Sequence, residues 1–133
     1  MRATCQCGDL TVMLDGQPEA VVACHCIACQ RRTGSVFGVL AFYPDERARI
    51  DGAATRFARP GASGDAFETF FCPVCGSTVY VRTARHPDGI GIAVGAIGDP
   101  LFPPPVRSIW ENTMHGWVSI SSAEQHCPLG RSG

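Results

Sequence analysis

The sequence has 133 residues, a formal net charge of −1, and 17% charged against 45% hydrophobic residues. These values suit one globular domain, residues 1–133, and exclude an intrinsically disordered chain. All 11 basic residues are arginine, which excludes a Schiff-base lysine and the lysine of a phosphate-binding loop. Without a net positive charge or an apolar run of about 20 residues, we expect no nucleic-acid partner, no membrane partner and a cytoplasmic location.

Short apolar runs separated by turn-forming residues characterise the chain. It contains 15 glycines and 10 prolines, which favours a mainly β fold without long helices. Apolar alternation predicts strands at residues 4–14, 35–43, 67–71, 77–82 and 90–97, with a last pairing segment at 108–120. We also expect a hairpin at 49–57, a loop or single helical turn at 30–34, an exposed loop at 60–65, and a flexible tail at about 122–133.

Seven of the eight cysteines fall into groups with spacings of one or two residues. In a reducing compartment, such groups are more often metal ligands than disulfide partners. The groups are Cys5 and Cys7; Cys24, Cys26 and Cys29; and Cys72 and Cys75. The eighth cysteine, Cys127, lies in the polar tail, and we interpret it as a free thiol.

The first and last groups together supply four thiolates. Tetrahedral zinc has Zn–S bonds of ~2.3 Å and so needs sulfur atoms roughly 3.8 Å apart, which a two-residue turn provides. After Cys72 and Cys75, Gly76 can adopt the left-handed conformation that ends such a turn. We place Cys5 and Cys7 on one face of the N-terminal strand. Because four thiolates fill the zinc shell, this set predicts a closed, structural site.

The middle group supplies three thiolates, one fewer than a closed shell, and we expect it on irregular backbone. Catalytic zinc sites keep one position for water or substrate, so Cys24, Cys26 and Cys29 are the candidate catalytic residues. Two alternatives remain. Cys127, His126 or His25 could complete a second structural shell, or the triplet could hold no metal and be redox-active.

Three motifs, taken in this order, resemble the glutathione-dependent formaldehyde-activating enzyme family. They are Cys-x-Cys-Gly at 5–8, Cys-His-Cys-x-x-Cys with a following glycine at 24–34, and Phe-Cys-x-x-Cys-Gly-Ser at 71–77. The resemblance implies Mss4-like coiled antiparallel β-sheets stapled by two zinc ions, one structural on the four-cysteine set and one catalytic on the triplet. Ser108 departs from the pattern, because many relatives carry histidine there.

The resemblance also implies a carbon–sulfur lyase that joins glutathione and formaldehyde, or a related small aldehyde, as S-(hydroxymethyl)glutathione. Glutathione carries two carboxylates, so Arg31 and Arg32 beside the triplet are candidates for bidentate contacts. Three thiolates around a divalent ion leave a net charge of −1, which weakens its Lewis acidity. We therefore rank hydrolysis by activated water below thiol chemistry.

Two other functions are consistent with the cysteine pattern. A non-enzymatic Mss4-like zinc module that binds a protein partner would have a closed second site. A zinc-ribbon nucleic-acid binder would draw on Arg47, Arg49, Arg56 and Arg59, but acidic residues alternate with these arginines and the net charge is negative. The sequence leaves the oligomeric state open.

Overall fold

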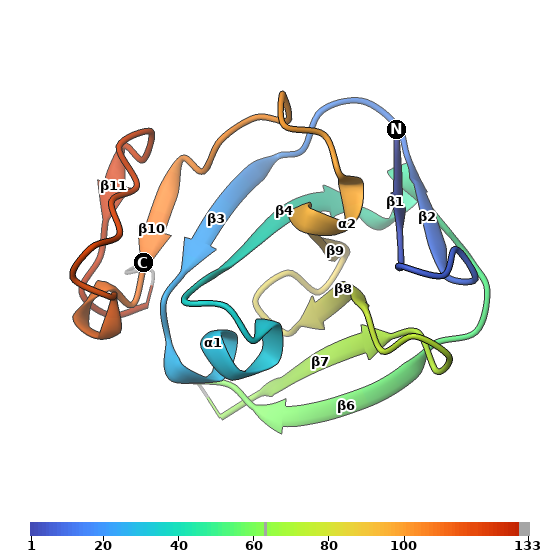
Figure 1. The fold of residues 1–133 in the computed structure, drawn as a ribbon, viewed down its shortest axis with the longest axis horizontal. Helices are drawn as coiled ribbons and strands as arrows, with labels where there is room; N and C mark the ends of the chain where they lie inside the picture. Colours follow the sequence, from blue (N-terminus) through green and yellow to red (C-terminus); the bar gives the residue numbers. More distant parts are fainter. Residues whose placement is uncertain (63, 131–133) are drawn as a thin grey trace.

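The computed structural model describes residues 1–62 and 64–130, and the fold is mostly β, as predicted. Within these residues a three-stranded sheet has the order β1-β2-β5, and an eight-stranded sheet has the order β11-β10-β3-β4-β9-β8-β7-β6 (Figure 1). This two-sheet arrangement with few helices is consistent with the Mss4-like fold.

The strands are short and the helices shorter still. The strands are β1 (Arg2–Thr4), β2 (Thr11–Leu14), β3 (Ala20–Cys24), β4 (Gly38–Pro44), β5 (Ala48–Asp51), β6 (Thr55–Pro60), β7 (Ala66–Phe71), β8 (Thr78–Thr83), β9 (Gly89–Ala93), β10 (Arg107–Ile109) and β11 (Gln125–His126). The helices are α1 (Ile27–Thr33), α2 (Val94–Ile97) and the 3-10 helices η1 (Asp45–Arg47) and η2 (Glu111–Thr113). None of these helices has the length and apolar character that crossing a membrane requires.

Neighbouring strands are antiparallel except at β10, which runs parallel to both β3 and β11. Figure 1 shows the larger sheet curving from β10 and β3 round to β7 and β6, with α1 between β3 and these last two strands in this view. The β1–β2 hairpin lies at the opposite side. The curvature brings the end of β6 and the start of α1 to the same end of the molecule.

One apolar core joins the two sheets. Val12 and Leu14 of β2 point inward while Met13 between them is exposed, as expected for a strand with one buried face. They belong to a buried cluster that also contains Cys5 and Cys72. Each fully buried aliphatic side chain contributes roughly 1.5–3 kcal/mol, so this core anchors the turns that carry those two cysteines.

Two strand predictions were wrong at the N-terminal end and in the middle of the chain. The expected strand at 4–14 is two strands, β1 and β2, with a turn between them. The expected hairpin at 49–57 does not form, because β5 pairs with β2 in the small sheet and β6 pairs with β7 in the large one. A turn signal does not specify which strands pair across it.

Two further segments contain less strand than predicted. The apolar run at 90–97 ends in α2, and a short apolar run does not distinguish strand from helix by its pattern alone. In the segment 108–120, pairing stops after Ile109, because Trp110 adopts a left-handed conformation with φ of 59° and leads into η2.

The segment beyond residue 122 is hydrogen-bonded to the rest of the structure as far as Leu129. β11 pairs with β10, and the Trp110 amide donates to the Leu129 carbonyl over 2.9 Å. Residues 131–133 of the expected tail lie outside the described residues. The flexibility of the tail stays a prediction.

Candidate metal centres

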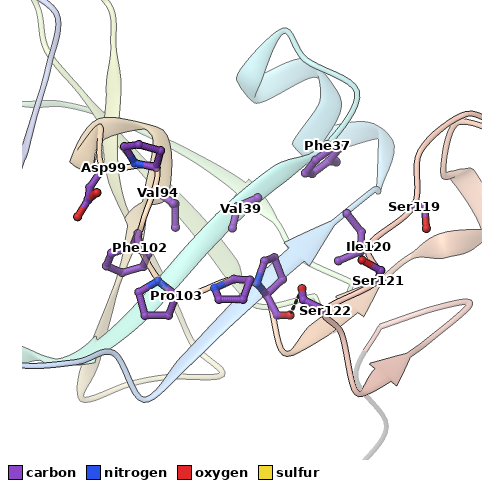
Figure 2. A pocket seen from close by; sticks show the side chains of 13 residues that line it. Phe37, Val39, Val94, Asp99, Phe102, Pro103, Ser119, Ile120, Ser121 and Ser122 are labelled. Atoms are coloured by element: carbon purple, nitrogen blue, oxygen red, sulfur yellow. Dashed lines mark hydrogen bonds between the residues drawn. The ribbon is translucent and has the colours of Figure 1, made fainter.

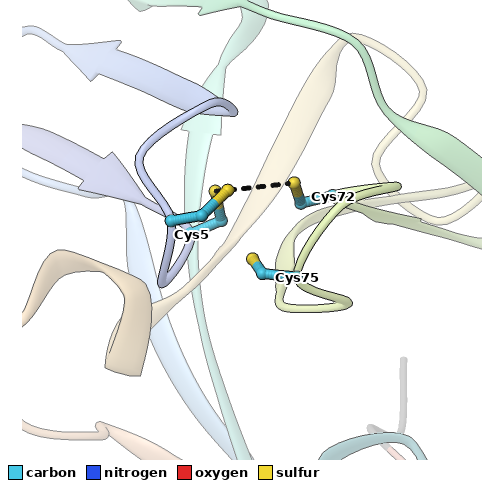
Figure 3. A group of neighbouring side chains, drawn as sticks. Cys5, Cys72 and Cys75 are labelled. Atoms are coloured by element: carbon cyan, nitrogen blue, oxygen red, sulfur yellow. Dashed lines mark hydrogen bonds between the residues drawn. The ribbon is translucent and has the colours of Figure 1, made fainter.

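Four cysteines from two distant turns converge at the edge of the core (Figure 3). Cys5 and Cys7 lie between β1 and β2, and Cys72 and Cys75 follow β7. All four Sγ atoms lie within 4.8 Å of one another. The Cys7 Sγ is 3.7 Å from that of Cys5 and 3.6 Å from that of Cys72, close to the roughly 3.8 Å that tetrahedral thiolates around zinc require. The donor set therefore fits zinc.

The backbone of both turns is arranged around these sulfur atoms. The Leu10 amide donates to Cys5 Sγ over 3.3 Å, and the Val74 amide donates to Cys72 Sγ over 3.4 Å. Such bonds favour the thiolate form that binds metal. Gly76 has the predicted positive φ, 79°, and its amide donates to the Cys72 carbonyl. The strand face predicted for the first two cysteines was wrong, because the turn itself carries them.

Polar contacts join the two turns directly. The Gln6 amide donates to Ser77 Oγ over 3.1 Å, although 71 residues separate them. The hydrogen bond between Ser77 and Cys75 lowers the pKa of the Cys75 thiol to about 5. The two turns are thus connected by hydrogen bonds between protein atoms, without a metal ion.

The second cluster is local and begins helix α1. Cys24 ends β3, Cys26 is the N-cap of α1, and Cys29 lies in its first turn. Their Sγ atoms lie within 4.8 Å of one another. The Cys29 amide donates to Cys26 Sγ over 3.3 Å, so a cysteine performs the capping that serine or aspartate usually provides. The expectation of irregular backbone was wrong, because Cys24 lies in a strand and Cys29 in a helix. The helical turn expected at 30–34 forms, but as the end of the longer helix Ile27–Thr33.

Hydrogen bonding within the triplet concentrates negative charge on one sulfur. Bonds from the Cys24 and Cys29 thiols lower the pKa of Cys26 to about 2, assisted by the Cys29 amide and the charge of Arg59. The same bonds, together with burial, raise the pKa of Cys24. A partly buried thiolate with two further thiols beside it attracts a soft divalent cation, so this donor set also fits zinc.

No fourth His, Cys, Asp or Glu side chain joins the triplet within residues 1–62 and 64–130. His25 instead bonds through Nε2 to Ser108 Oγ at 2.9 Å. His126 bonds through Nδ1 to Glu111 Oε2 at 2.8 Å, and Cys127 belongs to neither cluster. None of the three candidate fourth ligands is therefore in place.

The C-terminal segment braces the triplet through His25, which is fully buried between two of the cysteines. Its amide donates to the Ile109 carbonyl over 3.0 Å. Its carbonyl accepts from Thr113 Oγ1 at 2.8 Å and from Gln30 Nε2 at 2.9 Å. Sequence reasoning missed this bracing, because no motif joins positions more than 80 residues apart.

The two arginines of α1 occupy different surroundings. Arg31 is exposed. Arg32 is partly buried, and its charge interacts favourably with the Cys29 sulfur. Sequence reasoning grouped Arg59 with a nucleic-acid surface, but its charge acts on Cys26.

An apolar groove runs alongside β4, with Phe37 at one end (Figure 2). Its volume is about 550 Å³. Its apolar lining includes Phe102 and Ile120, and serine hydroxyls from the segment 119–122 line one side. The Phe37 ring packs on the His25 ring with centroids 5.3 Å apart. The groove therefore begins at Phe37, which contacts His25, the residue between Cys24 and Cys26 of the triplet.

Comparisons with known proteins agree with this architecture. The profile of the family described as glutathione-dependent formaldehyde-activating enzyme matches residues 1–119. A solved structure of a Rhodobacter sphaeroides protein has a TM-score of 0.59 and 20% sequence identity, and the match covers 96% of this chain and 99% of that one. At that identity the likeness shows the shared fold alone. A search of curated proteins finds no match.

Proposed function

The chain belongs to the glutathione-dependent formaldehyde-activating enzyme family, and on that premise we propose that it adds the thiol of glutathione to formaldehyde or a related small aldehyde. The product with formaldehyde is S-(hydroxymethyl)glutathione. Read in reverse, the reaction breaks a carbon–sulfur bond, which makes the enzyme a carbon–sulfur lyase.

The reaction balances without any oxidant or reductant. The glutathione sulfur donates an electron pair to the carbonyl carbon, and a carbon–sulfur bond forms. The carbonyl π bond breaks, and its electrons move to the oxygen. The proton lost by the thiol ends on that oxygen as the hydroxyl of the product. A catalyst must therefore favour the thiolate and hold the two reactants side by side.

We assign the chemistry to the triplet. Cys24, Cys26 and Cys29 would hold a zinc ion, whose Lewis acidity lowers the pKa of a substrate thiol. The observation that carries this assignment is the number of donors: three sulfur atoms converge, and no fourth His, Cys, Asp or Glu of the described chain joins them. A substrate sulfur can supply the fourth donor.

We assign a structural role to the four-cysteine set. Cys5, Cys7, Cys72 and Cys75 would hold a second zinc ion with a complete shell of protein ligands. Thiols of both clusters must stay reduced to bind metal, which supports a cytoplasmic location.

The carboxylates of glutathione need cationic partners near the triplet. Arg31 and Arg32 lie on the helix that carries Cys29, and guanidinium groups bind carboxylates in bidentate geometry. The partial burial of Arg32 favours it over the exposed Arg31, because a contact shielded from water is stronger.

Two measurements test this function. Metal analysis of the purified protein should find two zinc ions per chain. Exchange spectroscopy on mixtures of glutathione and formaldehyde should show adduct formation faster than the uncatalysed rate, which is subtracted. The Cys26→Ser variant should lose this acceleration while circular dichroism shows an unchanged fold. Cys127→Ser is the matched control, because Cys127 belongs to neither cluster.

A Cys26→Ser variant that keeps the wild-type rate contradicts the proposal. A third measurement replaces zinc by cobalt and follows the visible absorption as glutathione is added. An open site changes its absorption when a sulfur binds. If no added thiol changes the absorption, the result favours the alternative of a non-enzymatic zinc module that binds a protein partner.

A further inference from the structure

The apolar groove lies on the opposite face of β3 and β4 from the triplet. Gly38 pairs with Cys24, and Arg32 of α1 fills the space beside Gly38. The next pair along the two strands, Val39 and Ala23, points to the other face, because side chains alternate along a strand. Val39 lines the groove. The sheet therefore separates a ligand in the groove from the sulfur atoms of the triplet.

The floor of the groove is an uncovered edge of the apolar core. Phe102 belongs to the core cluster, and Val39 and Val94 are partly buried and pack against it. All three side chains line the groove (Figure 2). The volume of about 550 Å³ falls within the roughly 300–1,000 Å³ of small-molecule sites, whose lining is mostly apolar with a few polar groups. The groove thus has the size and lining of a small-molecule site.

Hydrogen bonds join the two walls of the groove. One wall is a run of three prolines that ends at Pro105, and the other is the segment 119–122. Ser122 Oγ donates to the Pro105 carbonyl over 2.7 Å. One residue beyond this proline, the Val106 carbonyl accepts from the Glu124 amide over 2.9 Å. These bonds fix the separation of the walls, so the groove is formed before a ligand binds.

The polar groups of the groove select against an anion. Among the described residues that line it, Asp99 alone is charged. Prolines have no amide hydrogen, so their wall offers carbonyl oxygens only, whereas the Ser119 and Ser121 hydroxyls can donate or accept. A carboxylate or sulfonate would lose water beside the Asp99 charge without gaining a cation. The lining therefore favours an uncharged or cationic ligand.

We propose that this groove is a second ligand site, which binds an uncharged or cationic apolar molecule whose polar group reaches Ser119 and Ser121. The inference does not depend on the proposed function of the triplet, because the two sites lie on opposite faces of the sheet. The ligand of the groove is a different molecule from glutathione, which carries two carboxylates.

Two fluorescent probes with the same aromatic skeleton test this selection on the zinc-loaded protein. N-phenyl-1-naphthylamine is uncharged, and 8-anilinonaphthalene-1-sulfonate adds a sulfonate. The uncharged probe should bind one site per chain, with a dissociation constant about tenfold or more below that of the sulfonate. Asp99→Asn should narrow this ratio severalfold, because it removes the negative charge and keeps an oxygen that can accept from the Leu101 amide.

Ile120→Trp locates the site, because a larger side chain at this position fills part of the groove. The uncharged probe should then bind about tenfold or more weakly. Ile50→Trp, at an exposed position of β5, is the matched control and should leave binding unchanged. Circular dichroism reports whether each variant is folded. Glutathione should not displace the probe.

Four results would overturn the inference. They are equal affinity for the two probes, a ratio that Asp99→Asn does not change, binding that Ile120→Trp does not weaken, and displacement of the uncharged probe by glutathione. Each of these results leaves the proposed function standing, because adduct formation is measured at the triplet.

Discussion

Ser108 Oγ lies 2.9 Å from Nε2 of His25, and both side chains are completely buried. Ser108 also lowers the pKa of the Glu111 carboxylate. The other ring nitrogen of His25, Nδ1, is buried without a hydrogen-bond partner, so Ser108 provides the side-chain hydrogen bond to this ring.

Removing the Ser108 hydroxyl should destabilise the protein. In Ser108→Ala, Nε2 of His25 becomes a second unsatisfied buried atom, so the free energy of unfolding should fall by about 1–3 kcal/mol. Urea denaturation followed by circular dichroism measures this change. Ser35→Ala, at an exposed position, is the control and should change the free energy by less than about 0.5 kcal/mol. An equally stable Ser108→Ala would mean that the hydroxyl does not hold the His25 ring.

The four-cysteine cluster should contribute to stability rather than to catalysis. Cys7→Ser removes one ligand from a metal site that joins positions 65 residues apart in the chain. Loop-closure entropy for that length predicts a loss of about 4 kcal/mol in the free energy of unfolding. The measurement is chemical denaturation of the zinc-loaded protein, with Cys127→Ser as the control. Unchanged stability in Cys7→Ser, with zinc content reduced by one ion per chain, would contradict a structural role.

The cysteine clusters were predictable because the information is local. Spacings of one and two residues identified all seven thiols that the structure brings into two groups. Pairing of the two distant turns also followed from the sequence, since each turn alone offers only two donors. The left-handed Gly76 was predictable for the same reason, because turn chemistry depends on a few adjacent residues.

Long-range relationships could not be predicted in this way. His25 and Ser108 are 83 residues apart, and nothing in either local sequence indicates that they meet. The strands β5 and β6 follow one another in the chain but belong to different sheets, because their partners β2 and β7 are set by tertiary packing. The effect of the Arg59 charge on the pKa of Cys26 is a further long-range relationship that the sequence pattern does not reveal.

The Glu111–His126 pair should make one part of the stability depend on pH. Its hydrogen bond with Glu111 raises the pKa of His126 above 6.5. That contribution is therefore complete below pH 6.5 and is lost as the pH rises through the raised value. The hydrogen bond from Ser108 and the His126 partner lower the pKa of Glu111 below 4.5, so its contribution is complete above pH 4.5 and is lost in more acid solution.

An NMR titration of the His126 ring checks this pH dependence. In the wild type the midpoint should lie above 6.5, and Glu111→Gln should move it back toward 6.5 because the negative charge is gone. His115 is the internal control, because it bonds to Gln30 rather than to a carboxylate. A His126 midpoint that Glu111→Gln leaves in place would show that the two side chains do not interact in solution.

Gln30 should set the metal affinity of the triplet without contributing a ligand. Its Nε2 donates to the His25 and Thr113 carbonyls over 2.9 and 3.1 Å, and its Oε1 lies 3.0 Å from His115 Nε2. Gln30→Ala removes these bonds and loosens His25, which connects Cys24 to Cys26, so zinc should bind the triplet about 10–100-fold more weakly.

Competition with a chromophoric chelator measures that affinity, and the four-cysteine site serves as the internal reference because Gln30 does not contact it. Gln17→Ala, at an exposed position, is the matched control and should leave both affinities unchanged. A uniform loss at both sites would indicate general destabilisation. We expect zinc affinity to fall at the triplet alone, because the Gln30 side chain connects α1 to the His25 and Thr113 carbonyls and so keeps Cys24 and Cys26 in their binding geometry.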